Sequence, residues 1–395
     1  MRFLIPFALM LGACQATEPV ATAPAPVVEV DPIGMLSEEE RGALLSKGAQ
    51  VLFWPQPLRA ERFRVMETQF PGRTAAPVSP RELPAGTPIP GADQIAEAMI
   101  DNDLVGLMVL QDGEVRFEGY GEGLTATDRW VSFSVAKSLT AVLAGAALKD
   151  GAIPSLEAPV TDFIPELSGS AYDGVTVEQL MTMRSGVAWD ENYASPTSDI
   201  AMLYSQPYQP GVDPNIDYLR KLERAAEPGS VFNYNTAETN LVGTLVERAV
   251  GKSLTAYAGE KLVWPAGLEG ELFWQVDTTG GNVGGCCISM RLGDYARIGQ
   301  WILEGAPDGS GGSVVDPDFL ANATAPAVNF GNGYGYGYFW WTYPGDAFGA
   351  IGIFGQGIYI DPADDLVIAY LGNWEGATSG QRSAIIGAVR EALGD

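Results

Sequence analysis

The sequence predicts an α+β fold, in which strands from both ends of the chain build an antiparallel sheet flanked by helices and the middle of the chain forms a helical insertion. Strand patterns separated by turn residues occur near residues 104–120 and return at 334–372, whereas short helical patterns fill much of the chain between them. The 395 residues are 46% hydrophobic and 18% charged, which is typical of a globular protein with a sizeable core.

The elements follow in order along the chain. Residues 104–110 and 114–120 are expected to form a hairpin around an Asp112-Gly113 turn. Residues 135–148 form an apolar, alanine-rich helix that ends at Asp150-Gly151. Further helices are expected at 177–183, 215–226, 238–250, 290–304 and 380–393, and further strands at 334–343, 357–361 and 366–372.

These elements divide the chain into four parts. Residues 1–13 are predicted to be a signal peptide and residues 14–37 a tether rich in proline and alanine. Residues 38–135 and 270–395 together form a discontinuous sheet domain, and residues 136–269 form the helical domain.

The amino terminus has the pattern of a targeting segment. An apolar run at residues 3–11 follows Arg2 and is too short to span a bilayer, so it is typical of a signal peptide. Residues 11–14 also resemble a bacterial lipobox, which implies that Cys14 is lipidated and, since Gln15 is not an aspartate, that the protein is an outer-membrane lipoprotein facing the periplasm. The alternative is an ordinary signal peptide cut near Ala16 or at residues 23–25.

The composition restricts the chemistry. The chain has no histidine, so a base must be lysine, tyrosine or a carboxylate, and no histidine-ligated metal site can exist. The net charge of −26 repels phosphate backbones, so we expect no nucleic-acid partner. Cys286 and Cys287 are adjacent; because a disulfide between neighbours is strained and rare, we expect two small buried residues, and neither a metal nor a cofactor.

Ser134 and Lys137 form an S-x-x-K pattern at the start of the helix expected at residues 135–148. A spacing of three puts both side chains on one helix face, where the helix dipole favours a developing oxyanion on the serine. Burial would make the lysine a better base. The alternative is a serine that caps the helix beside a solvated lysine.

Tyr234 lies at the mouth of the next long helix, in the stretch FNYNTAETNLVG. A tyrosine near a lysine can carry phenolate character and shuttle the proton that histidine carries elsewhere. The alternative is a packed aromatic side chain.

Together, WVSFSVAKSLT, FNYNTAETNLVG, GGCCISMRLGDYARIGQ and FGAIGIFGQGIYIDP resemble the motifs of the serine β-lactamase-like hydrolases over roughly residues 90–390. Within that family the sequence is most similar to the class C β-lactamase branch and its 6-aminohexanoate-dimer hydrolase and carboxylesterase relatives. The resemblance implies a β-lactamase/transpeptidase-like fold.

The resemblance also implies roles for particular residues. Ser134 matches the acylated nucleophile, Lys137 its partner, and Tyr234 the tyrosine of the Y-x-N motif. Ala350, or Ile351 one residue later, matches the residue whose N–H joins that of Ser134 in the oxyanion hole. The substrate-binding positions match Tyr193, Thr236, Phe348 and Gly349.

Two departures from the family pattern bear on the substrate. Ala347 and Phe348 replace the lysine and threonine of the K-T-G motif, so the groups that bind a β-lactam carboxylate are absent. Thr236 replaces the Y-x-N asparagine and is a poorer partner for an amide. We therefore expect a serine hydrolase of small amides or esters. The alternatives are a β-lactamase or D-Ala-D-Ala peptidase-like enzyme, or an inactive envelope lipoprotein with a binding role.

Lipidation of Cys14 is testable in cells. A clickable fatty-acid analogue should label the full-length chain and fail to label Cys14→Ser, because the thiol is the atom that the lipid modifies. Equal labelling of the two proteins would contradict the lipobox assignment.

Overall fold

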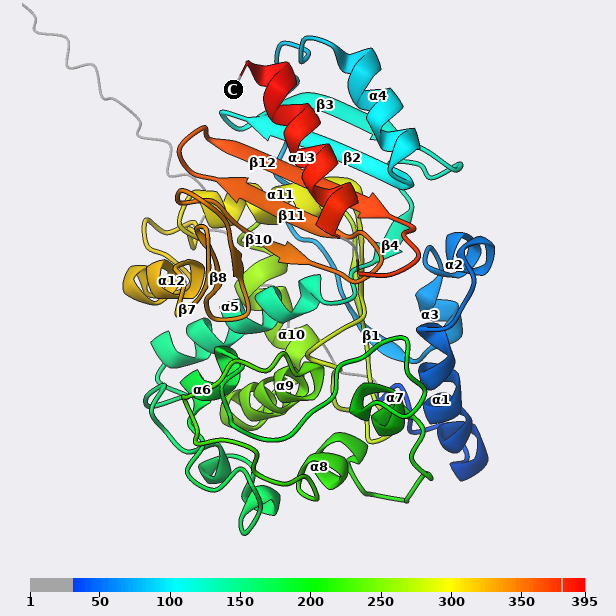
Figure 1. Cartoon of the computed structure of the whole chain (residues 1–395), viewed down its shortest axis with the longest axis vertical. Helices are drawn as coiled ribbons and strands as arrows, with labels where there is room; N and C mark the ends of the chain where they lie inside the picture. Colours follow the sequence, from blue (N-terminus) through cyan, green and yellow to red (C-terminus); the bar gives the residue numbers. More distant parts are fainter. Residues whose placement is uncertain (1–30, 378, 395) are drawn as a thin grey trace, which may run out of the picture.

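The computed structural model describes residues 31–377 and 379–394, so Cys14 and the expected signal peptide lie outside the described residues. Two antiparallel sheets and the surrounding helices make up the described chain (Figure 1). Within these ranges no helix is long and apolar enough to cross a membrane. The stretch 31–37, assigned above to the tether, is folded onto the protein: Ile33 is buried and its carbonyl accepts a hydrogen bond from Arg41 Nη2 at 2.9 Å.

The large sheet has eight strands in the order β3-β2-β12-β11-β10-β9-β8-β7. Its strands are β2 (Leu104–Gln111), β3 (Glu114–Tyr120), β7 (Val328–Gly331), β8 (Tyr334–Tyr336), β9 (Trp341–Thr342), β10 (Phe348–Ile351), β11 (Gly357–Asp361) and β12 (Leu366–Gly372). The antiparallel pairing of β2 with β12 joins the two ends of the chain, as expected. In the predicted hairpin, Asp112 and Gly113 both have positive φ, 53° and 75°, which a two-residue type I′ turn requires.

The small sheet has the order β1-β5-β6-β4 and lies next to the helical part of the molecule. Its strands are β1 (Gly72–Ala75), β4 (Arg129–Val131), β5 (Leu272–Gln275) and β6 (Ile288–Arg291).

Helices cover both faces of the large sheet (Figure 1). The helices are α1 (Glu38–Val51), α2 (Gln56–Arg62), α3 (Met66–Gln69), α4 (Ala92–Asp101), α5 (Val135–Lys149), α6 (Val177–Met181), α7 (Asp199–Tyr204), α8 (Pro214–Leu219), α9 (Thr236–Val250), α10 (Leu254–Ala258), α11 (Leu292–Leu303), α12 (Pro317–Thr324) and α13 (Ser379–Leu393), with helical turns at Val160–Asp162, Pro165–Leu167 and Gly259–Val263.

The continuous apolar sequence of β2 follows from this double cover. Leu107 and Val109 pack toward α4 and α13, whereas Met108 and Leu110 belong to the main core on the side of α11. Side chains alternate along a strand, so a strand covered on both faces needs apolar residues at every position.

Helix α5 crosses the middle of the molecule between the large sheet and the helices α6, α8 and α9 (Figure 1). Residues 135–147 of this helix are all buried, which explains its small and apolar composition. A Cβ on Gly145 would lie 2.3 Å from the Phe319 ring, so α12 approaches this helix too closely for any larger residue. The rigid core thus holds the beginning of α5, where Ser134 lies.

Two of the predicted elements are wrong. Residues 334–343 form a hairpin of β8 and β9 instead of one strand, because Gly337 N–H bonds to the Trp340 carbonyl at 2.8 Å and Phe339 adopts a positive φ of 60°. The helix expected at 215–226 ends at Leu219. Its predicted second half instead bonds to the loop at residues 186–188, so tertiary pairing overrides the helical pattern there.

Candidate active site

Ser134 and Lys137 are in contact at the start of α5, as the three-residue spacing predicts. Lys137 Nζ lies 2.9 Å from Ser134 Oγ. The serine makes no capping hydrogen bond with its side chain, and the lysine is only 1% exposed. The alternative of a capping serine beside a solvated lysine is therefore wrong. Phe133, just before the serine, has a positive φ of 44°, a backbone shape that is unusual for a large residue and often found at functional sites.

The environment of Lys137 favours its neutral form more than water does. Burial lowers the pKa of this lysine to about 8, and the nearby Glu191 carboxylate acts in the opposite direction. Its ammonium or amine group also donates a hydrogen bond to the Gly285 carbonyl at 2.9 Å. A pKa of about 8 leaves roughly a tenth of the lysine neutral at pH 7.

Tyr234 lies beside this pair, with its ring centroid 5.3 Å from Lys137 Nζ. It stacks on Trp341 at 5.9 Å and meets Tyr336 edge-on at 6.1 Å, so the hairpin of β8 and β9 forms an aromatic wall around it. Burial, and secondly Glu191, raises the pKa of Tyr234 well above its usual value, although a hydrogen bond with Ser134 opposes this. The side chain is therefore a neutral phenol at neutral pH, and the phenolate character suggested by the sequence is disfavoured.

Glu191 is the residue that the sequence analysis missed. Its carboxylate accepts hydrogen bonds from the Thr236 backbone N–H at 3.1 Å and from the Tyr193 hydroxyl at 2.6 Å, as well as from the Thr236 hydroxyl and Trp189 Nε1. Thus Tyr193 and Thr236, both predicted to bind substrate, are joined through one acid. The only signal in the sequence is an acidic residue two positions before Tyr193.

Ala350, the residue expected to contribute to an oxyanion hole, lies near the end of β10. Ala350 is fully buried on this strand, and a Cβ on Gly352 just beyond it would lie 2.6 Å from the carbonyl oxygen of Ser132. The end of β10 is therefore directly beside the segment that leads into Ser134. Phe348 instead packs edge-on against Trp340 at 5.4 Å.

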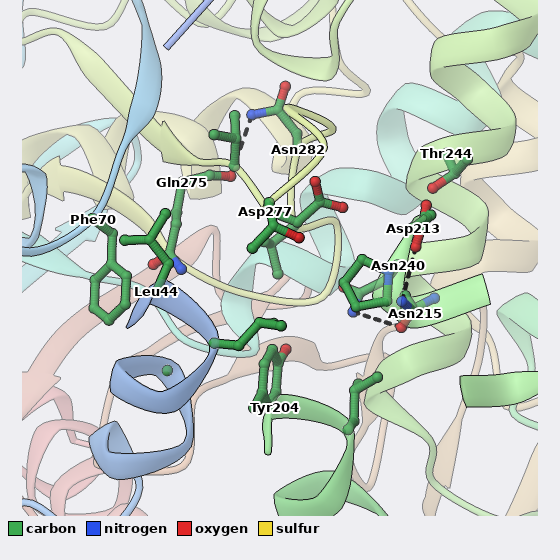
Figure 2. Close-up of a pocket in the computed structure, with 17 residues that line it drawn as sticks. Leu44, Phe70, Tyr204, Asp213, Asn215, Asn240, Thr244, Gln275, Asp277 and Asn282 are labelled. Carbon is green, nitrogen blue, oxygen red and sulfur yellow. Dashed lines mark hydrogen bonds between the residues drawn. The ribbon is translucent and has the colours of Figure 1, made fainter. Parts of the chain in front are cut away.

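A cavity opens at Ser134. Its walls include Phe70, Tyr204, Thr236 and the two adjacent cysteines; Phe348 and Gly349 are not part of its lining. A second cavity, shown in Figure 2, shares Phe70 and Tyr204 with the first and therefore adjoins it. Figure 2 shows the acidic side chains of Asp213 and Asp277 in the second cavity, whose lining does not include Ser134.

Cys286 and Cys287 form a disulfide, so the expectation of two unpaired small residues is wrong. Disulfides between adjacent cysteines are rare, but here the backbone allows one, with Cys287 at a positive φ of 73°. In the described part of the chain, no group of three or more cysteine or acidic side chains is arranged to hold a metal ion.

Comparison with known proteins gives matches of several kinds. A model of the Beta-lactamase family matches residues 92–389. The 6-aminohexanoate-dimer hydrolase of Paenarthrobacter ureafaciens is 31% identical over 314 residues, which cover 72% of this chain and 78% of that protein.

The chain is also similar to solved structures. A Bacillus anthracis protein with a provisional assignment as a 6-aminohexanoate-dimer hydrolase has a TM-score of 0.75 at 21% identity, covering 86% of this chain and 94% of its own. EstCE1, a hydrolase with promiscuous acyltransferase activity, has a TM-score of 0.62 at 16% identity, covering 76% and 97%. A class C β-lactamase in complex with cefoxitin has a TM-score of 0.56 at 18% identity, covering 76% and 99%.

The pH dependence of hydrolysis tests the electrostatics of Lys137. If this lysine must be neutral to accept a proton, kcat/KM rises with pH and has its midpoint near the lysine pKa of about 8. Glu191→Gln removes the carboxylate that raises this pKa, so the midpoint should move to lower pH.

The matched control is Asp190→Asn, which removes an exposed carboxylate from the adjacent position and should leave the midpoint unchanged. An equal midpoint in the wild type and in folded Glu191→Gln would contradict this account of the site.

Proposed function

This chain belongs to the Beta-lactamase family, and from that premise we propose that it cleaves small amides or esters through an acyl-enzyme formed on Ser134. It is a hydrolase of the serine type by family, with the β-lactamase/transpeptidase-like fold that the sequence motifs predicted. The observation that carries the proposal is the 2.9 Å hydrogen bond between Ser134 Oγ and a fully buried Lys137.

In the acylation step, neutral Lys137 accepts the hydroxyl proton while Ser134 Oγ forms a bond to the substrate carbonyl carbon. The carbonyl oxygen becomes an oxyanion, which the N–H groups of Ser134 and Ala350 would stabilise. The positive end of the α5 dipole adds to this effect, because Ser134 directly precedes the 15-residue helix.

Collapse of this intermediate breaks the bond to the leaving amine or alcohol, which needs a proton. We assign this proton to Tyr234, whose phenol is protonated at neutral pH and to which Lys137 can return a proton. In deacylation the same groups act in reverse: a water gives its proton to the pair, attacks the ester carbon and releases Ser134.

The proposed substrate class depends on which polar side chains of the protein can contact the substrate. The 6-aminohexanoate-dimer hydrolase relative is by its name an amide hydrolase, and in this chain Ser134, Lys137 and Tyr234 match the family motifs. Ala347 and Phe348 offer neither a cation nor a hydroxyl for a β-lactam carboxylate. An amide or ester without that carboxylate therefore suits the site better than an antibiotic.

We also propose that the enzyme works in the bacterial envelope as a lipid-anchored protein, with no membrane contact other than the lipid. The lipobox-like residues 11–14 support this location. The disulfide between Cys286 and Cys287 is a second, independent argument, because disulfides persist mainly in oxidising compartments.

Single substitutions test the division of roles. Ser134→Ala should abolish acyl-enzyme formation, and Lys137→Ala should be nearly as severe. Tyr234→Phe removes one hydroxyl and should lower kcat for an activated ester by roughly 10²–10⁴. Tyr334→Phe, an exposed tyrosine outside the site, is the control and should retain full activity.

The double variant Lys137→Ala/Tyr234→Phe should be little worse than either single change, because the two groups act on the same proton. The readout is kcat/KM with folding checked by circular dichroism. Wild-type activity in folded Tyr234→Phe would show that the proton takes another route.

Substrate preference is a separate test. Turnover of p-nitrophenyl acetate or butyrate should exceed that of nitrocefin, since one charge-assisted hydrogen bond worth roughly 1.5–3 kcal/mol is missing, or about one to two decades in rate. Efficient hydrolysis of cephalosporins would overturn the amide or ester assignment in favour of a β-lactamase.

A further inference from the structure

We propose that the Cys286–Cys287 disulfide is a positioning element of the catalytic pair, and that its reduction lowers turnover. The proposal deepens the proposed function, because it assumes that Ser134 and Lys137 react as described above. Cys286 and Cys287 take no part in the chemical step, but they hold Lys137 and Ser134 in place.

The disulfide lies between two residues, Gly285 and Ile288, which we call the first and second anchor. Both form hydrogen bonds with the segment that carries Ser134 and Lys137. On one side, the Gly285 carbonyl accepts the hydrogen bond from Lys137 Nζ at 2.9 Å. On the other side, the Ile288 carbonyl accepts from the Ser132 N–H at 2.7 Å, and Ile288 N–H donates to Ser132 Oγ at 3.1 Å. Cys286 and Cys287 are thus the only residues between Gly285, which binds Lys137, and Ile288, which binds the segment that leads to Ser134.

The first anchor is fixed by close packing against α9. A Cβ on Gly285 would lie 2.8 Å from the Thr236 carbonyl oxygen, and one on Gly284 would lie 2.7 Å from that of Thr239. Gly285 N–H bonds to Asn240 Oδ1 at 2.8 Å. This half of the segment thus belongs to the helical part of the molecule.

The second anchor belongs to the small sheet, because Ile288 is the first residue of β6 and pairs with Trp274 of β5. Between the anchors the backbone must turn, and Cys287 does so with a positive φ of 73°. A non-glycine residue rarely adopts this conformation. A bond between neighbouring side chains closes a small ring around their peptide unit and so limits the conformations open to the connection. Reduction removes this limit.

The disulfide can be reached from the cavity that holds Ser134. Cys286 is half-buried, and both cysteines line that cavity beside Phe133 and Thr236. A small water-soluble phosphine such as tris(2-carboxyethyl)phosphine would cleave the S–S bond in a balanced reaction. Phosphorus gives two electrons to the disulfide and takes oxygen from water, and the two protons of that water complete two thiols.

The experiment uses the full chain with Cys14→Ser as background, so that Cys286 and Cys287 are the only cysteines left. The oxidised protein should show no free thiol after denaturation and two after phosphine treatment. Following removal of the phosphine, reduction should lower kcat for p-nitrophenyl butyrate by roughly 10- to 100-fold, the loss expected when a reacting group is misplaced by about 1 Å, with KM changed less than about twofold.

The double variant Cys286→Ser/Cys287→Ser keeps the side-chain size and cannot form the bond. It should show the same low kcat, no response to phosphine and no recovery on oxidation, whereas reoxidation of the reduced parent should restore its kcat. If the disulfide only stabilised the fold, its reduction would change the melting temperature. It would not reversibly lower kcat while leaving KM nearly unchanged.

Two free thiols in protein isolated without reductant, or full kcat in the reduced parent or in the double variant, would overturn the proposal. Failure of the proposed function is distinguishable, since it would appear as activity in Ser134→Ala whatever the state of the cysteines.

Discussion

The burial of Lys137 is the constraint on which the site depends. A charged lysine in a core costs free energy, so the protein must offer it hydrogen-bond acceptors, and it does so with Ser134 Oγ and the Gly285 carbonyl. Among the ion pairs of residues 31–377 and 379–394 none includes Lys137. Desolvation therefore dominates, and the pKa of about 8 gives Lys137 a neutral fraction near pH 7 that an exposed lysine lacks.

Much of the fold was predictable because its signals are local. The Asp112-Gly113 turn, the alanine-rich α5 and the apolar β12 each carry their own pattern, and the structure confirms them. The contact between Ser134 and Lys137 was also predictable, since helix geometry alone brings residues three apart together.

The rest depended on contacts between distant segments. Glu191 is unremarkable in the sequence and becomes central only because Thr236, 45 residues later, donates to it. The hairpin of β8 and β9 could not be distinguished from one strand, since the turn at Gly337 is stabilised by bonds from its neighbours to Met181 and Ala323. The disulfide was not predicted from the sequence. The rarity of disulfides between adjacent cysteines takes no account of the contacts that hold Gly285 and Ile288 on either side of this pair.

In the mechanism that we propose, this chain without histidine uses two groups where other hydrolases use one imidazole. Lysine supplies a basic amine, but its pKa has to be lowered, whereas tyrosine supplies a proton donor that burial keeps neutral. Both shifts come from the same desolvated pocket, because excluding water favours the neutral form of each group.

Glu191 opposes part of this shift for the lysine and reinforces it for the tyrosine. Its four hydrogen-bond donors satisfy the carboxylate without a cation, so it lies near the pair without taking the proton of Lys137 into an ion pair. Burial shifts the two pKa values in opposite directions, whereas Glu191 raises both, so the packing around α5 sets the difference between them.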